Sequence, residues 1–260
     1  MSHRKPRTEK NTVKHKTKEK FDGKEPNTTV TVSEKTLLTF INAVADCNEE
    51  AILNIEPDKL RVSLVDNSNI YMVMVDCECK TGIGKDVPVR VGVDFKLLKK
   101  TLMYAAGGNV TLEISKNQIG ITYGRFTSKI PTADIAFMRK EPHPPELKLS
   151  TSFEMPGKYL LAACRMVSTG NGKIYIYVKS KVVFVAAHEG DLCMKEVVGT
   201  VEKASQARSF FSNNYLSLIA KSIKDVSATC EIDIDHPIKI TAEKNGCNLV
   251  FMLAPRIESD

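Results

Sequence analysis

The stretch Ile135-Ala-Phe-Met-Arg-Lys-Glu-Pro-His-Pro-Pro-Glu-Leu-Lys-Leu149 lies near the middle of the chain and divides it into two halves. It holds three prolines within four positions, Pro142, Pro144 and Pro145. Proline has no amide hydrogen to donate and restricts the residue before it, so neither a helix nor a central strand can run through this stretch. We therefore expect residues 135–149 to form an extended connector.

The chain after the connector repeats the order of elements found before it. Helices are predicted near residues 33–46, 94–106, 157–168 and 213–224, so they recur about every 60 residues. Ser33 and Asp94 can cap the first two helices, and Gly107-Gly108 can end the second. The first helix has an apolar stripe at positions i, i+3, i+4 and i+7, formed by Leu37, Phe40, Ile41 and Val44.

Runs of residues typical of strands surround the predicted helices. They are Thr28–Val32, Ala51–Ile55, Leu60–Leu64, Ile70–Cys77, Pro88–Val93, Asn109–Ile114, Gln118–Tyr123, Phe126–Pro131, Thr151–Glu154, Lys173–Val178, Val182–Ala187, Asp191–Val198, Gln206–Phe210, Ser227–Ile232, Pro237–Ala242 and Asn248–Leu253. A unit of one helix and three strands thus occurs four times. The repeat predicts an α+β protein with two similar domains, residues 29–134 and 150–260, each with two helices packed on antiparallel sheets.

Charge is distributed unevenly along the chain, whose net charge is +6. Residues 1–28 hold nine Lys or Arg against four acids and almost no large apolar side chains. Such a segment cannot bury enough surface to offset its ordering entropy, so we expect a disordered basic tail. The tail is either a solubilising extension or a sequence-independent grip on phosphates.

The predicted helices carry most of the remaining positive charge. They contain eight Lys or Arg against three acids, while the rest of the body is negative. Because a helix on a sheet has one outward stripe, these cations indicate a positive surface that faces a polyanion; the alternative is four ordinary solvated faces. The sequence has no helix-turn-helix, zinc finger or base-stacking motif, so phosphates would be held without reading the sequence.

Several classes of protein are disfavoured. No apolar run approaches the roughly 20 residues that span a bilayer, and the N-terminus lacks a secretory signal, so we expect an intracellular protein without a membrane association. The seven cysteines are scattered, which favours structural thiols over metal ligands, and we expect no metal and no cofactor.

A catalytic role is also disfavoured, because no nucleophile, zinc or redox motif appears and the five histidines are not paired in sequence. Gly82-Ile-Gly-Lys-Asp86 superficially resembles a phosphate-binding loop, but it lacks the earlier Gly and the Ser or Thr after Lys. A small nucleotide-binding enzyme that uses this loop therefore stays as an alternative to a binding protein without catalytic activity.

The final predicted strand runs directly into Leu253-Ala-Pro-Arg-Ile-Glu258, behind four helix-and-strand units and a proline-rich connector. In this it resembles the sliding clamps of the proliferating cell nuclear antigen family, most closely the archaeal members. The resemblance covers residues 28–258. Further matching motifs are Leu64-Val-Asp66, Val91-Gly-Val-Asp94, Ala163-Cys-Arg165 and Asp235-His-Pro237.

The resemblance implies a DNA polymerase processivity factor for replication and repair. Three copies would form a pseudo-six-fold ring around double-stranded DNA, with Phe126–Pro131 of one copy paired to Leu192–Val198 of the next. An alternative within the family is one subunit of a heteromeric ring. The helices would line the hole, so the residues implied to face DNA are Lys96, Lys99, Lys100, Lys158, Arg165, Lys221 and Lys224.

The resemblance also implies a hydrophobic pocket between the connector and the C-terminal tail. DNA polymerase, flap endonuclease and DNA ligase would dock there, and a clamp loader would place the ring on DNA. The matching positions are Val65, Met72, Phe137, Met138, Pro237, Phe251, Leu253, Ala254, Pro255 and Ile257. For Val65 and Met72 the alternative is ordinary core. The chain departs from the family in its basic tail and in the positive connector residues Arg139 and Lys140.

Overall fold

The computed structural model describes residues 28–82, 89–103, 107–167 and 172–256. Its elements are β1 (Thr28–Ser33), α1 (Glu34–Ala45), β2 (Glu50–Glu56), β3 (Lys59–Val65), β4 (Tyr71–Glu78), β5 (Lys80–Thr81), β6 (Val89–Asp94), α2 (Phe95–Thr101), β7 (Asn109–Ile114), β8 (Gln118–Tyr123), β9 (Phe126–Pro131), β10 (Thr151–Pro156), α3 (Gly157–Met166), β11 (Lys173–Glu189), β12 (Leu192–Ser212), α4 (Asn213–Ile223), β13 (Ser227–Ile232), β14 (Ile238–Lys244) and β15 (Cys247–Leu253).

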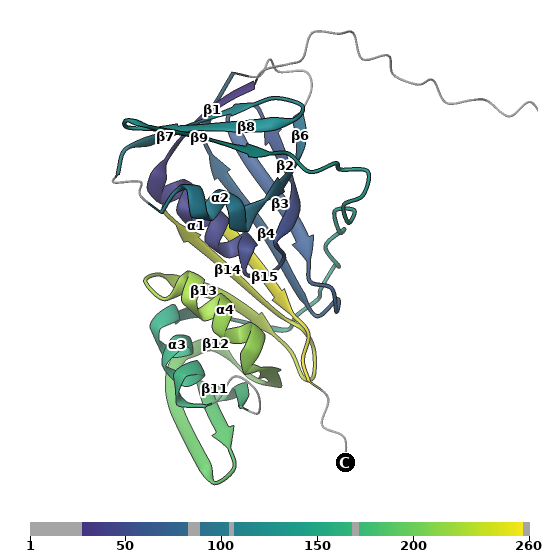
Figure 1. Ribbon diagram of the computed structural model, residues 1–260. Helices are drawn as coiled ribbons and strands as arrows, with labels where there is room; N and C mark the ends of the chain where they lie inside the picture. Colours follow the sequence, from purple (N-terminus) through teal and green to yellow (C-terminus); the bar gives the residue numbers. More distant parts are fainter. Residues whose placement is uncertain (1–27, 83–88, 104–106, 168–171, 257–260) are drawn as a thin grey trace, which may run out of the picture.

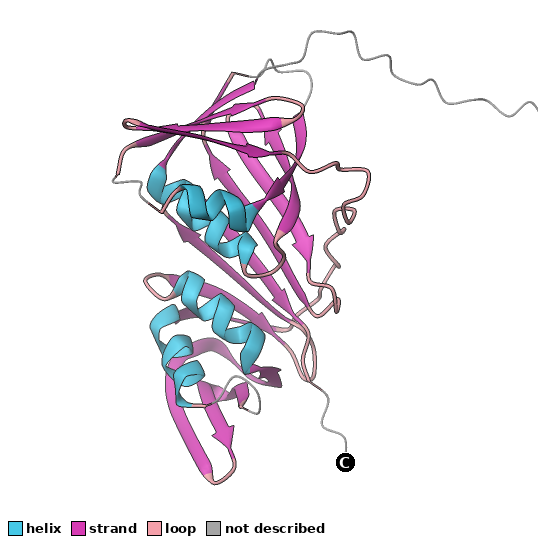
Figure 2. Ribbon diagram, viewed as in Figure 1, coloured by secondary structure: helices cyan, strands magenta, loops and turns pink. Residues whose placement is uncertain are grey.

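The helices form two pairs, one in each half of the chain. α1 packs on α2 and α3 packs on α4, and Figure 2 shows both pairs on the same side of the strands. Gly157 opens α3 because that helix lies very close to α4: a Cβ at this position would overlap the carbonyl group of Ile223. The repeated sequence unit therefore builds one helical layer over both halves.

The predicted caps form, although one helix is shorter than expected. The Ser33 hydroxyl accepts a hydrogen bond from the Thr36 N–H at 3.1 Å, and the Asp94 carboxylate accepts one from the Leu97 N–H at 2.7 Å. α2 ends at Thr101 rather than near residue 106. Residues 104–106 of the predicted helix lie outside the described part of the chain.

One large sheet joins the two halves. Its eight strands lie in the order β10-β13-β14-β15-β4-β3-β2-β6, so the second half meets the first where β15 pairs with β4. We call this pairing the β15–β4 seam. It is antiparallel over seven residues, and it places Phe251 opposite Val73 and Leu253 opposite Tyr71. A second sheet, β5-β1-β7-β8-β9, ends in β9 as an edge strand.

β11 and β12 are long strands where four shorter ones were predicted. They pair with each other, and the register shifts between Ser180 and Val182. Thirteen residues of extended strand would span about 40 Å, yet the rings of Tyr175 and His188 lie 5.0 Å apart. β11 therefore doubles back near Ser180, whose φ of 61° is positive. We call β11 and β12 together the C-terminal ribbon; the four predicted strands are its arms.

The connector contains neither helix nor strand over its described residues 135–149, as its prolines predict. Figure 1 shows it running along the outside of the first half's strands before it reaches β10. It begins in close contact with β6, since a Cβ at Gly92 would overlap both the Ala133 carbonyl oxygen and the Met138 sulfur. Glycine at position 92 thus allows the connector to lie flat against the sheet.

Candidate nucleic-acid interface and docking pocket

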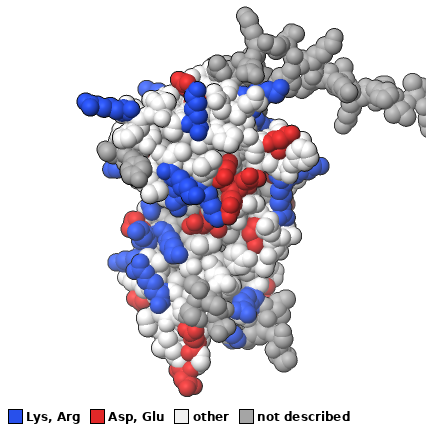
Figure 3. All heavy atoms as spheres, in the orientation of Figure 1, with Lys and Arg blue, Asp and Glu red and all other residues white. Residues whose placement is uncertain are grey.

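The helical layer is strongly positive. Within the four described helices there are seven Lys or Arg, at 35, 96, 99, 100, 158, 165 and 221, against one acid, Glu34. Figure 3 shows Lys and Arg side chains along the side of the molecule that carries the helices in Figure 1. Because the layer spans both halves, these cations form one extended surface suited to phosphates.

A hollow between the two halves brings several of the predicted DNA-facing residues together. It has a volume of about 300 Å³, and Lys99 of α2 faces Lys221 and Lys224 of the second half across it. Its other lining residues are Thr39, Asn42, Asp46, Ser222 and Lys244. The Lys244 ammonium group donates to the Ser222 carbonyl at 2.8 Å, so its position is fixed. The hollow thus concentrates positive charge where the two halves meet.

The other predicted cations lie apart from this hollow. Lys96 forms an ion pair with Glu49, which offsets its charge, so its prediction as a phosphate contact is weakened. Lys158 lies 5.1 Å from the ring centre of Tyr159, at the start of α3. Lys100 and Arg165 are exposed on α2 and α3.

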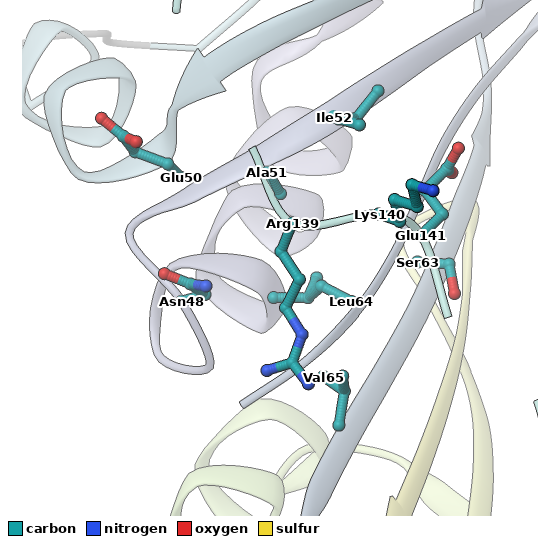
Figure 4. Close-up of a pocket in the computed structure, with 10 residues that line it drawn as sticks. All are labelled: Asn48, Glu50, Ala51, Ile52, Ser63, Leu64, Val65, Arg139, Lys140 and Glu141. Carbon is teal, nitrogen blue, oxygen red and sulfur yellow. The ribbon is translucent and has the colours of Figure 1, made fainter. Parts of the chain in front are cut away.

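The connector is fastened to the first half by two charged residues. Arg139 donates to the Asp66 carbonyl oxygen at 2.7 Å and also bonds the Asn69 side chain. Glu141 accepts from Asn54 at 2.5 Å and from Arg90 at 2.9 Å. Figure 4 shows Arg139 reaching past Leu64 to Val65. Arg139, one of the two positive connector residues that depart from the family pattern, therefore serves to attach the connector.

Little space remains beneath this part of the connector. The recess there has a volume of about 10 Å³, which is room for about one water molecule. Its lining residues are Asn48, Glu50, Ala51, Ile52, Ser63, Leu64, Val65, Arg139, Lys140 and Glu141. A docking partner must therefore bind beside the fastened connector or displace it.

Two predicted pocket residues are misplaced. Phe251 and Leu253 are 0% and 1% exposed, and the Phe251 ring stacks on Tyr71 with centres 6.4 Å apart. Side chains alternate along a strand, so these two residues of β15 point toward the helices. Neither can line an outer pocket, and that part of the prediction is wrong.

The residue that shares the outer face with the other predicted positions is Met252. The register sets Val65 opposite Met72, and Met72 opposite Met252, so the three form one row across β3, β4 and β15. Strand alternation could have selected Met252 from the sequence. Val65 is half-buried, while Met72 and Met252 keep 8% exposure each. We call these three residues the outer apolar row.

The remaining predicted pocket residues differ in exposure. Met138, Pro237, Ala254 and Pro255 are half-buried, whereas Phe137 is 90% exposed. Ile257 lies outside the described residues. The C-terminal segment is held near the β3–β4 turn, because the Ala254 N–H donates to the Ile70 carbonyl at 2.9 Å. Exposed Ile70 and Ile234 add apolar surface that sequence reasoning missed.

Asp66 ties these parts together. Burial opposes ionisation of its carboxyl, but hydrogen bonds from the N–H groups of Tyr71, Ile70 and Ser68 and from the Tyr215 hydroxyl hold its pKa below the ordinary value of 3.8. The Tyr215 bond, at 2.9 Å, joins α4 of the second half to the first half. The carboxylate therefore supports both the β3–β4 turn and the contact between halves.

Two buried thiols and the described end of the glycine loop have structural contacts. Burial raises the pKa of Cys164 and of Cys230 to about 12, so these thiols stay protonated at neutral pH. Most of Gly82–Asp86 lies outside the described residues; Gly82 itself donates its N–H to the Thr29 carbonyl at 2.8 Å. No described helix has the length and apolar character needed to cross a membrane.

Curated proteins that match the chain are clamps of archaeal origin. The chain is 30% identical over 240 residues to the DNA polymerase sliding clamp of Methanothrix thermoacetophila, which covers 88% of this chain and 98% of that protein. It is 31% identical over 227 residues to the DNA polymerase sliding clamp of Methanococcoides burtonii, which covers 82% of this chain and 91% of that protein. A scan against protein-family models found no match.

Solved structures share the fold. A. fulgidus PCNA, solved with the C-terminal region of FEN-1 bound, has a TM-score of 0.79 at 22% identity over 90% of this chain and 100% of that one. The proliferating cellular nuclear antigen of Entamoeba histolytica has a TM-score of 0.77 at 17% identity over 89% and 99%. These similarities confirm the predicted α+β fold of helices on antiparallel sheets.

Proposed function

The chain belongs to the family of DNA polymerase sliding clamps, and from this premise we propose that three copies close into a ring around duplex DNA. The observation that carries the proposal is the helical layer, in which seven cations outnumber one acid and which lies on the same side of both halves (Figure 2). A layer of this kind turned inward would hold phosphates without reading bases. The ring would then slide, and topological linkage would replace tight binding.

The repeated unit supplies a rule for closing the ring. β15 ends the last unit and pairs with β4, while β9 ends an earlier unit and is an edge strand. The first arm of β12, residues 192–200, stands in the ribbon where β4 stands in the first half. We propose that β9 of one copy pairs with this arm of the next, repeating the seam between copies. Phe126, Leu192 and Val197, which are 56%, 43% and 56% exposed, lie at these two edges.

The register of the seam can be transferred to the proposed interface. Counting from the hairpin turns before β15 and β9, Leu249 corresponds to Ser128. We match buried Val62 of β3 to buried Val185 of β11, so their strand partners Val75 and Glu196 correspond. Ser128 would therefore lie opposite Glu196 of the neighbouring copy. The Ser128 hydroxyl oxygen is buried and has no hydrogen-bond partner within the described residues of one chain. A carboxylate from the next copy would accept its proton and satisfy it.

The same register also supports a second candidate assembly, a ring of different chains. Lys129 would lie opposite Lys195 if every copy were identical. Two like charges directly opposite each other on neighbouring strands are destabilising. One subunit of a heteromeric ring is therefore the second candidate, in which a different chain would supply the partner of Lys195.

The docking pocket of the proposed clamp is formed by the outer apolar row together with Met138, Pro237, Ala254 and Pro255, and exposed Phe137 lies at its rim. Methionines adapt to different apolar partners. Partners would be a DNA polymerase, a flap endonuclease and a DNA ligase, and a clamp loader would open the ring. The A. fulgidus clamp with the bound FEN-1 segment gives a precedent for the flap endonuclease. The ring itself would perform no chemistry, need no cofactor and reside with chromosomal DNA.

Primer extension on a long template, with a clamp loader present, tests this proposal. Lys99→Glu combined with Lys221→Glu reverses two charges in the hollow, and we expect product length to fall toward that of polymerase alone. Lys116→Glu, on the exposed β7–β8 turn, is the matched control and should keep full processivity. Unchanged processivity in the double variant would show that the helical layer does not face DNA.

A further inference from the structure

The outer face of the C-terminal ribbon carries a set of aromatic rings that do not belong to the main core. They are Tyr175, Tyr177, Phe184, His188 and Phe210. The inward residues of the same strands, such as Ile174, Ile176 and Val185, are buried beneath the helices. Alternation along the strands therefore places the rings on the side away from the helical layer. We call this side the aromatic face.

The rings form two rows across the arms of the ribbon. In the first row Tyr175 stacks on Phe210 at 5.3 Å between ring centres, and His188 meets Tyr175 edge-on at 5.0 Å. In the second row Tyr177 stacks on Phe184 at 5.0 Å. Tyr175, Tyr177, Phe184 and His188 are half-buried, so part of each ring is open to solvent.

Cations alternate with the rings. The Lys195 ammonium group lies 4.0 Å from the ring centre of Phe184 and 5.4 Å from that of Tyr177. The Arg208 guanidinium lies 5.3 Å from the centre of Tyr175, and Lys173 lies 5.5 Å from the centre of Phe210. At the described register positions of this face, paired as Lys173 with Ser212 through His188 with Cys193, no acid occurs.

The corresponding face of the first half shows that the rings are not needed to build such a sheet. There, outward positions on β2, β3 and β4 hold Asn54, Arg61, Met74 and Asp76, and the connector is fastened over part of that face. The described outward positions of these three strands hold no aromatic side chain. The aromatic face is thus a specific feature of the second half.

We propose that the aromatic face binds single-stranded nucleic acid. A base would stack on Tyr177, which Phe184 supports from its other side, while phosphates would be neutralised by Lys195 and Arg208. Sequence-tolerant binding of single strands requires this alternation of planar rings with cations. An acidic peptide would use the cations but would not need the rings. This site lies opposite the helical layer, so it is separate from the proposed grip on duplex DNA.

Fluorescence anisotropy with labelled oligo(dT) of about 15 nucleotides tests the proposal on the full chain at low salt; the length covers a typical site of this kind. Tyr177→Ala should raise the dissociation constant roughly 5- to 150-fold, the range that stacking of one base implies. Tyr177→Phe keeps the ring and should bind like the parent chain. Duplex DNA of the same length should bind both variants equally, because its bases are already stacked.

A second variant keeps every aromatic ring of this face. Lys195→Ala with Arg208→Ala removes two exposed cations, and the slope of log K against log salt for oligo(dT) should fall by about 1.4, or 0.7 per phosphate contact. Lys99→Glu with Lys221→Glu should weaken duplex binding and leave the dependence on Tyr177 unchanged, which separates this site from the helical layer.

Three results would overturn the proposal. The first is no binding of oligo(dT) by the parent chain at low salt. The second is equal affinity of the parent and Tyr177→Ala chains for oligo(dT), together with an unchanged salt slope in the double variant. The third is competition by a poly-glutamate peptide that is as strong as competition by unlabelled oligo(dT) and independent of Tyr177, which would assign the face to acidic peptides instead.

Discussion

β15 and β9 end equivalent units of the repeated pattern, but β15 pairs on both sides, with β14 and β4, whereas β9 pairs on one side only, with β8, among the described strands. The β15–β4 seam pairs seven residues on each side and buries Phe251 and Leu253 completely or nearly so. β9 is an edge strand and exposes Phe126, and the first arm of β12 exposes Leu192 and Val197. The chain thus forms one strand pairing, between β15 and β4, within itself. It leaves exposed the two strand edges, of β9 and of the first arm of β12, that we propose pair between copies.

One repeated unit can therefore specify an assembly that stops growing once its strand edges are all paired. Exposed edge strands invite pairing with other chains, and a ring satisfies every edge where an open stack would not. If the junction between copies follows the seam, the angle between halves sets the angle between subunits. Substitutions in the seam, at the exposed strand edges and at the contact between the halves should therefore have different effects.

The largest effect is expected from Phe251→Ala in the seam. Removing a fully buried ring loses its burial and leaves a cavity, so the free energy of unfolding should fall by about 3–5 kcal/mol. Urea denaturation followed by circular dichroism measures this loss. Ile234→Ala, at a half-exposed position, should change stability by less than about 0.5 kcal/mol. A loss below about 1 kcal/mol for Phe251→Ala would contradict its place in the core.

The open edges should respond in the opposite way. Phe126→Asp with Leu192→Asp places charges on exposed side chains, so the free energy of unfolding of the single chain should change by less than about 1 kcal/mol. Buried at an interface between copies, the same unpaired charges would be costly, and the assembly should dissociate to single chains. Sedimentation velocity measures the change, with Phe126→Leu as the control that keeps the assembly.

Ser128→Ala sharpens the comparison at a single contact. Since the Ser128 hydroxyl has no partner among the described residues of one chain, its removal should leave the chain's stability within about 0.5 kcal/mol. Between copies it would lose a hydrogen bond to the Glu196 carboxylate, worth about 1.5–3 kcal/mol, so dissociation of the ring should become roughly 10- to 150-fold easier. Equal dissociation of parent and variant rings would rule out this register.

The smallest effect is expected at the contact between the two halves. Tyr215→Phe removes the hydrogen bond to the ionised Asp66 carboxylate and should cost about 1.5 kcal/mol at neutral pH, the low end for such a bond, because three N–H groups still donate to the carboxylate. The pKa of Asp66 is lowered in the folded chain, so the stability from its ionised form is present above the ordinary pKa of 3.8 and is lost as the pH falls through the lowered value. The difference between parent and variant should therefore shrink in acid, as urea titrations at several pH values would show. A difference that grew in acid would contradict this assignment.

Much of the fold could be predicted because it follows from local patterns repeated four times. Helix caps at Ser33 and Asp94, strand alternation and the prolines of the connector each act over a few residues. The C-terminal end of α2 and the merging of strands in the C-terminal ribbon could not be predicted in this way. The C-terminal end of α2 depends on packing. The break predicted between Val178 and Val182 is where β11 reverses at Ser180, but the sequence does not show that the arms on either side of it belong to one continuous run of paired residues.

The candidate site was predictable in composition but less so in orientation. Counting cations on the predicted helices found the positive layer, yet the ion pair of Lys96 with Glu49 joins residues 47 positions apart and leaves no local signal. The pocket prediction took Phe251 and Leu253 from a motif and ignored their alternation with Met252. Arg139 was noticed for its charge, but its bond to Asp66 depends on how the connector lies across the sheet.

Identical copies of this chain should repeat the β15–β4 seam and close a ring of three. Sedimentation velocity of the full chain, at physiological salt and over a range of concentrations, measures whether they do. We expect a single species of about 86 kDa, three times the chain mass of 28.8 kDa. A species that stays at 28.8 kDa at every concentration would contradict a ring closed by this chain alone.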